Sequence, residues 1–112
     1  MIKDPSILIE HILESIDLIE SYTENITYVS FINSNQIQDA VLRRIMIIGE
    51  AVKNLPEEFK IDHPEISWKD IAGMRDVLIH TYFGIDLDLT WETIDQDIPK
   101  LKEDLLKIKE KL

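Results

Sequence analysis

Apolar residues in the last quarter of the chain recur at alternating intervals of four and three. They are Ile94, Ile98, Leu101, Leu105, Ile108 and Leu112. This spacing places them along one side of an α-helix, because about 3.6 residues complete each helical turn. It is incompatible with a half-buried strand, in which apolar residues alternate with a period of two. We therefore expect a long helix, with Pro99 either kinking it or marking the start of its longer part.

Two further amphipathic segments precede this one. The first begins at Asp4-Pro5, a capping residue followed by a proline suited to the first helical position. It is expected to reach about Tyr28, with fraying over residues 23–27. The second segment follows a cluster of capping residues at 33–35 and is expected to end at about Asn54.

Shorter signals complete the secondary structure. Pro56 ends the second helix, one short turn is expected over residues 57–61, and a third long helix is expected from Trp68 to about Tyr82. Strand-like alternation, internal repeats and linkers are all lacking. The sequence therefore predicts one all-α domain, residues 1–112, folded as an up-and-down bundle of four long helices plus a short one.

Charge and composition exclude several classes of function. The chain has 22 Asp and Glu against 12 Lys and Arg, a formal net charge of −10, and no cysteine. Disulfides and thiolate chemistry are therefore excluded, as is a general basic surface for nucleic acid. Any nucleic-acid contact must be local, and residues 41–75, where six bases balance six acids, are the place to expect it. With no apolar run long enough to cross a bilayer, we expect a cytoplasmic protein.

The middle of the second helix carries apolar residues around most of its circumference. Residues 45–48 read Ile-Met-Ile-Ile. A helix covered on one side only should have a polar opposite face. We therefore expect a homodimer built through the second and third helices, in which another copy of the chain provides the second cover.

Residues 73–84 combine arginine, aspartate, histidine and tyrosine. On a continuous helix, Asp76 would lie one turn from His80 and could accept a hydrogen bond from one imidazole nitrogen. The other nitrogen of His80 would then be free for proton transfer, and the planar guanidinium of Arg75 could bind a phosphate. Tyr82 would lie about 20° from Arg75 around the axis, whereas His80 would lie about 140° away. Taken alone, these residues fit a surface ion pair and a packed tyrosine at least as well.

Metal and cofactor motifs are lacking in the sequence. His11, His63 and His80 do not have the spacing of a metal site. With three glycines in the chain, there is also no glycine-rich loop to hold a nucleotide phosphate. We therefore expect neither a metal nor a cofactor.

The segment of residues 73–84 gives the chain a resemblance to the HepT-like proteins, a branch of the HEPN superfamily. Residues 75–82 match that family's pattern of Arg, four residues, His, one residue and Tyr. Residues 47–51, 64–68 and 73–84 also resemble the family in the same order, so that the likeness covers nearly the whole chain. Ser67 departs from the pattern, which more usually has a proline there.

This resemblance implies a homodimeric helical bundle that acts as a metal-independent endoribonuclease on RNA. It further implies the toxin of a type VII-like HEPN/MNT toxin–antitoxin pair, whose antitoxin is an MNT-type nucleotidyltransferase encoded next to it. By the same resemblance, Arg75 and His80 are the catalytic residues, Asp76 supports them, and AMP transferred to Tyr82 blocks the toxin. The two copies of the motif are then expected to meet across the dimer.

Two other functions remain open from the sequence. The chain could be a non-catalytic helical subunit that binds a nucleotide or regulates a minimal nucleotidyltransferase. It could also be a purely structural dimer, in which changing Arg75 or His80 affects stability alone. Cleavage of RNA would distinguish the ribonuclease from both of these alternatives.

Overall fold

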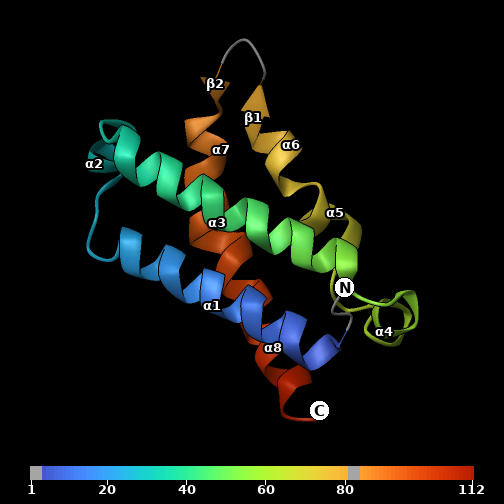
Figure 1. Ribbon diagram of the computed structural model, residues 1–112. Coiled ribbons are helices and arrows are strands. Elements are labelled where there is room, and N and C mark those ends of the chain that lie inside the picture. Colours follow the sequence, from blue (N-terminus) through green and yellow to red (C-terminus); the bar gives the residue numbers. More distant parts are fainter. Residues whose placement is uncertain (1–3, 81–83) are drawn as a thin grey trace.

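The computed structural model describes residues 4–80 and 84–112 and confirms an all-α fold (Figure 1). Its helices are α1 (Pro5–Thr23), α2 (Tyr28–Ile32), α3 (Asn35–Asn54), α4 (Glu57–Asp62), α5 (Trp68–Ala72), α6 (Met74–Leu78), α7 (Leu87–Glu92), the π-helix η1 (Thr93–Asp97) and α8 (Ile98–Lys109). Two strands of two residues each, β1 (Ile79–His80) and β2 (Gly84–Ile85), form a small antiparallel pair.

Helices α1 and α3 lie side by side in opposite directions, and α8 crosses behind them (Figure 1). Helices α1 and α3 both begin at the predicted caps. The Asp4 carboxylate accepts a hydrogen bond of 2.9 Å from the Ser6 amide, and the Ser34 hydroxyl accepts one of 3.2 Å from the Ile37 amide. These caps satisfy amides that have no partner within the first helical turn.

The first helix is shorter than predicted. It ends at Thr23, and Asn25 adopts a left-handed conformation with φ of 58°. A separate helix, α2, follows, and the Thr27 hydroxyl caps it by accepting from the Ser30 amide at 3.1 Å. The sequence predicts only a frayed helix end here, because five residues are too few to show helical periodicity.

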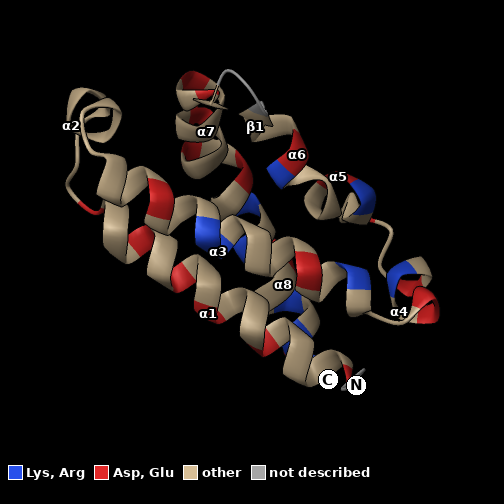
Figure 2. Cartoon of the chain, turned by 45° about the horizontal axis from the view of Figure 1, so that its top comes forward, with Lys and Arg blue, Asp and Glu red and all other residues tan. Residues whose placement is uncertain are grey.

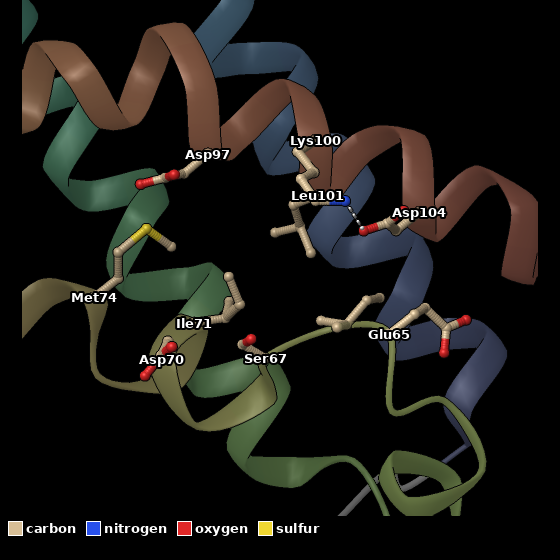
Figure 3. A pocket seen from close by; sticks show the side chains of 10 residues that line it. Glu65, Ser67, Asp70, Ile71, Met74, Asp97, Lys100, Leu101 and Asp104 are labelled. Atoms are coloured by element: carbon tan, nitrogen blue, oxygen red, sulfur yellow. Dashed lines mark hydrogen bonds and ion pairs between the residues drawn. The ribbon is translucent and has the colours of Figure 1, made fainter.

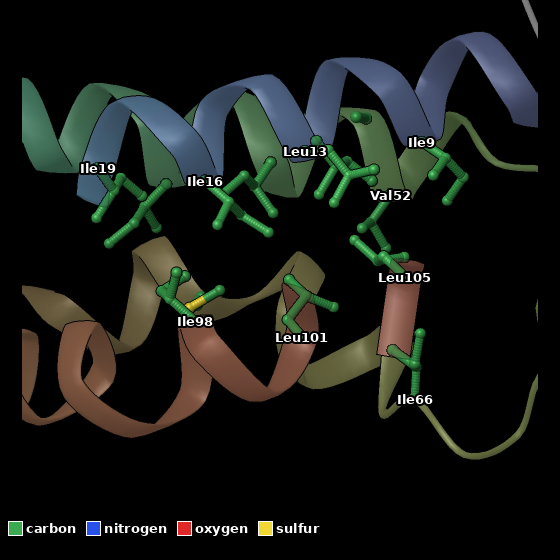
Figure 4. Packing of buried hydrophobic residues seen from close by; sticks show 14 of the residues in the cluster. Ile9, Leu13, Ile16, Ile19, Val52, Ile66, Ile98, Leu101 and Leu105 are labelled. Carbon is green, nitrogen blue, oxygen red and sulfur yellow. The ribbon is translucent and has the colours of Figure 1, made fainter. Parts of the chain in front are cut away.

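The core lies where α1, α3 and α8 meet. Figure 4 shows Ile16 and Ile19 of α1 pointing toward Ile98 and Leu101 of α8. The predicted apolar seam of the last helix supplies four buried residues, namely Ile98, Leu101, Leu105 and Ile108. At its two ends, Ile94 is half-buried against the core and Leu112 is exposed. The seam is thus confirmed over its central turns.

The predicted interruption near Pro99 is also confirmed. Pro99 lies in the first turn of α8, and η1 directly before it connects α7 to α8. Proline has no amide hydrogen to donate to the carbonyl four residues earlier, so regular α-helical bonding cannot continue through this point. A short helix followed by a longer one is the result.

The predicted third long helix is wrong in extent. Gly73 separates α5 from α6, and the chain leaves the helical conformation at Ile79, with φ of −108° and ψ of 123°. The Leu78 carbonyl instead accepts a hydrogen bond of 2.8 Å from the Asp86 amide, across the turn of the hairpin. Gly84 has φ of 80°, which favours glycine and suits a tight return of the chain.

The lysines of α8 are engaged by acidic side chains. Lys102 forms ion pairs with Glu20 at 2.7 Å and Asp17 at 3.3 Å, and Lys109 pairs with Glu10, so both join α8 to α1. The hydrogen bond to Glu20 raises the pKa of Lys102 above its ordinary value of 10.5. These pairs agree with the view that the lysines are a helix end and not an RNA-binding surface.

Candidate functional site

The position of Arg75 depends on a close contact between α3 and α5. Gly49 is buried on α3, and a Cβ atom placed there would lie 3.1 Å from the Ala72 carbonyl oxygen. Such a distance is tighter than ordinary packing contacts, so glycine lets the end of α5 approach the α3 backbone without a shift. Helix α6 begins two residues later and brings Arg75 beside α3.

Arg75 lines a cavity of about 260 Å³ between α3 and the α5–α6 segment. The cavity is lined by Met46, Gly49, Glu50, Lys53, Ala72, Arg75 and Asp76. Arg75 Nη1 donates a hydrogen bond to Asp76 Oδ1 at 3.2 Å, and Lys53 Nζ lies 3.5 Å from Glu50 Oε1. Two cations therefore line one small cavity, each held by a neighbouring carboxylate.

Neither ion pair is strong enough to keep a phosphate out. The side chains of Arg75 and Lys53 are 48% and 56% exposed, and their carboxylate partners are more exposed still. Ion pairs of this kind contribute about 0–1 kcal/mol each, because water and salt screen them. Both cations can therefore turn from their carboxylates to a phosphate, and the planar guanidinium can bind two of its oxygens.

The backbone places His80 differently from the predicted helix. Because α6 ends at Leu78, His80 lies in β1, opposite Gly84, and it is not one helical turn from Asp76. The predicted helical spacing of Asp76 and His80 is therefore wrong, and the Asp76 carboxylate accepts a hydrogen bond from Arg75. The angles of about 140° from Arg75 to His80 and about 20° from Arg75 to Tyr82 assume a continuous helix, so they do not apply. Tyr82 itself lies outside the described residues.

A second cavity, of about 230 Å³, lies between α5 and the start of α8 (Figure 3). Its floor is apolar and includes Ile66 and Leu101, while four carboxylates, those of Glu65, Asp70, Asp97 and Asp104, line it. Lys100, the one cation in this lining, is bound to Asp104 at 3.3 Å. A phosphate would meet like charge here, so the Arg75 cavity is the better anion site.

The described side chains include no cluster of metal ligands. Within residues 4–80 and 84–112, no group of three His, Asp or Glu side chains lies close enough to hold a metal ion. His11 lies on α1 beside a groove along α3, whereas His63 follows α4, with its ring 4.6 Å from that of Phe59. Over the same ranges, no helix has the length and apolar character that a membrane span requires.

Comparison with known families decides the identity of the chain. The family model described as "Ribonuclease HepT-like" matches residues 12–108, which is most of the sequence. The chain belongs to the HepT-like family. The resemblance noted from residues 47–51, 64–68 and 73–84 is thereby confirmed.

Curated relatives of this HepT-like protein carry ribonuclease names. A "Gamma-glutamylcyclotransferase and putative RNase" of Methanocaldococcus jannaschii is 59% identical over 112 residues, all of this chain and 50% of the relative. A "Probable ribonuclease HepT" of Thermococcus cleftensis is 50% identical over 94 residues, 84% of this chain and 86% of the relative. A "Putative RNase" of Caldanaerobacter subterraneus subsp. tengcongensis is 42% identical over 109 residues, 97% of each chain. The chain thus spans half the length of the first relative, and no solved structure matches it.

Sequence reasoning missed two residues of the Arg75 cavity. Lys53 supplies its second cation, and Gly49 allows the approach of α5 that forms it. Gly49 and Lys53 lie four positions from each other on α3, which puts them on the same side of the helix. Nothing in the local pattern, however, connects that side with Arg75, because the connection depends on how α5 packs.

Proposed function

We propose that this HepT-like protein is a metal-independent endoribonuclease that uses Arg75 and His80 to cleave RNA. The observation that carries the proposal is the cavity in which Arg75 and Lys53 are both half-exposed and weakly paired. On a chain with a net charge of −10, such a site is where a phosphate would bind. Membership in a ribonuclease family supports the choice of RNA as the substrate.

The proposed reaction needs no metal. His80 takes the proton from a ribose 2′-hydroxyl while that oxygen attacks the adjacent phosphorus. The bond from phosphorus to the 5′-oxygen breaks, and this oxygen takes a proton from solvent, which leaves a 2′,3′-cyclic phosphate and a 5′-hydroxyl. Arg75 and Lys53 stabilise the negative charge that gathers on the phosphate oxygens. Asp76 supports Arg75 by accepting a hydrogen bond from its guanidinium until a phosphate takes its place.

The test is cleavage of a synthetic single-stranded RNA with and without EDTA. We expect the same rate in both, with a cyclic phosphate or its opened form on one product. RNA with 2′-O-methyl groups throughout should resist cleavage, because the attacking hydroxyl is blocked. Cleavage that disappears in EDTA, or that persists on the methylated RNA, would contradict the mechanism.

The protein is also proposed to be the toxin of a type VII-like pair and to act as a homodimer, with an MNT-type nucleotidyltransferase as its antitoxin. The family resemblance supports this role. The acidic surface supports it as well, since it would favour association with a basic partner. The alternative of a nucleotide-binding regulatory subunit is less favoured, because a cavity of about 260 Å³ is smaller than most small-molecule sites.

AMP transfer to Tyr82 is the proposed means of inhibition. The phenol oxygen attacks the α-phosphorus of ATP, pyrophosphate leaves, and the phenol proton is released. The product adds about one negative charge and an adenosine two residues along the chain from His80, and is proposed to exclude RNA by repulsion and by volume.

Mass spectrometry tests this proposal after incubation with the neighbouring nucleotidyltransferase, ATP and magnesium. We expect one AMP per chain, loss of RNA cleavage, and no modification of the Tyr82→Phe variant. Tyr28→Phe is the matched control, since Tyr28 is a partly exposed tyrosine on α2 whose hydroxyl contacts Asp88. Inhibition without any adduct would instead favour simple complex formation.

A further inference from the structure

Helix α3 has an outer face with no partner among the described residues. We define the outer face of α3 as Asp39, Arg43, Met46, Ile47, Glu50 and Asn54. Asp39, Arg43 and Glu50 are exposed, and Met46 and Ile47 are half-exposed. The residues directly before and after this apolar pair, Ile45 and Ile48, are fully buried. The two half-exposed apolar side chains at its centre are the residues that a second copy was expected to cover.

This face is continuous with the Arg75 cavity. Met46 and Glu50 line that cavity on one side of α3, and they also line a groove on the other side, beside Leu8 and His11 of α1. A molecule seated on the outer face of α3 would therefore form one wall of the Arg75 cavity. Figure 2 shows acidic and basic positions following one another along α3.

The charges on this face have a symmetric order. Arg43 lies three residues before Met46, and Glu50 lies three residues after Ile47. Each is thus about 5 Å along the axis from the midpoint between Met46 and Ile47, on opposite sides of it. Because they are seven positions apart, close to two turns, both project from the same side of the helix.

We propose that two copies of the chain associate through this face, with their α3 helices antiparallel and a twofold axis between Met46 and Ile47. Each Arg43 then faces the partner's Glu50, and each Met46 packs on the partner's Ile47, as the self-complementary pattern of an isologous interface requires. A parallel arrangement would instead place arginine against arginine and glutamate against glutamate. Charge complementarity therefore selects the antiparallel register.

The arrangement also brings a residue of the second copy to the candidate site. Since Glu50 lines the Arg75 cavity, the partner's Arg43 would reach its edge and join Arg75 and Lys53 as a third cation. Arg43 is free for this role, because among the described residues it forms no ion pair, and Glu50 has only its exposed contact with Lys53 at 3.5 Å. The inference rests on the homodimer of the proposed function and supplies its register.

Charge reversal tests the register. We expect Arg43→Glu and Glu50→Arg each to raise the dimer dissociation constant at least about tenfold, because each puts like charges into both symmetric contacts. The double variant R43E/E50R should dimerise like the wild type. An equimolar mixture of the two single variants should also dimerise, since every contact again joins an acid to a base. Sedimentation equilibrium across a range of protein concentrations gives these constants.

Controls separate this inference from the proposed activity. Lys111→Glu makes the same change in net charge as Arg43→Glu at an exposed position near the chain end and should leave dimerisation unchanged. Circular dichroism shows whether each variant is folded. A wild-type monomer, single variants that dimerise normally, or a mixture of folded single variants that stays monomeric would overturn the register. None of these readouts involves RNA, so a failure of RNA cleavage would leave this result standing. Cleavage by a wild-type monomer would overturn the interface and the proposed homodimer, but not the proposed reaction at Arg75 and His80.

Discussion

Replacing His80 with alanine should lower the rate of RNA cleavage by about 10²–10⁴-fold, the range that general base catalysis contributes. The expectation follows from the proposed role of His80, which alone takes the proton from the attacking hydroxyl. Arg75→Ala should cause a loss of similar size by removing a cation from the developing charge on phosphate. Arg75→Lys should recover part of the rate, because an ammonium keeps the charge but lacks the planar fork. Single-turnover cleavage of one synthetic RNA measures all three.

The matched control is His63→Ala, since His63 lies after α4 and does not line the Arg75 cavity. It should cleave RNA at the wild-type rate. Arg75 is exposed, so its loss should change the free energy of unfolding by less than about 0.5 kcal/mol. If His80→Ala or Arg75→Ala cleaves as fast as the wild type while remaining folded, the catalytic assignment is wrong.

The elements predicted well are those with strong local signals. Helix α3 begins at its predicted cap and ends at Asn54 as expected, because a capping serine, a periodic apolar face and a following proline all act within a few residues. The seam of α8 is likewise local, and Pro99 marks its start through a property of proline itself.

The region around the candidate site was predicted less well, because tertiary contacts decide its backbone. The start and stop signals in the sequence predict a continuous helix from Trp68 to about Tyr82, yet the Leu78 carbonyl accepts a hydrogen bond from the Asp86 amide. A β-branched residue, Ile79, adopts the extended conformation at that point. The family pattern singles out Arg75 and His80 as candidates, but the backbone at His80 could not be inferred from helical angles.

The second cation of the cavity depends on a contact between residues distant in sequence. Lys53 shares a cavity with Arg75 only because Gly49 lets the Ala72 carbonyl approach α3. A single sequence shows that Gly49 lies on the helix and that a glycine there costs stability. The packing of the folded chain determines which backbone segment lies against Gly49.

The missed helix α2 leads to the largest expected effect on stability. Phe31 is fully buried, its ring centroid lies 5.2 Å from that of Trp91 on α7, and its carbonyl accepts a hydrogen bond of 2.9 Å from the Gln38 side chain on α3. Phe31 thus joins α2 to α7 through its ring and to α3 through its backbone carbonyl. Helix α7 follows directly on β2, the strand that pairs with His80, so this packing also supports the hairpin that carries the proposed base.

Phe31→Ala should therefore lower the free energy of unfolding by about 3–5 kcal/mol, since it removes a buried aromatic ring and leaves a cavity. That is a large part of the roughly 5–15 kcal/mol that stabilises a typical domain. Val29→Ala is the control on the same helix, because Val29 is 61% exposed, and it should cost no more than about 0.5 kcal/mol beyond its effect on helix propensity. Urea denaturation followed by circular dichroism gives both values. If the two substitutions lower the free energy of unfolding equally, Phe31 does not anchor α2. The packing of α2 on α7 would then not stabilise the hairpin.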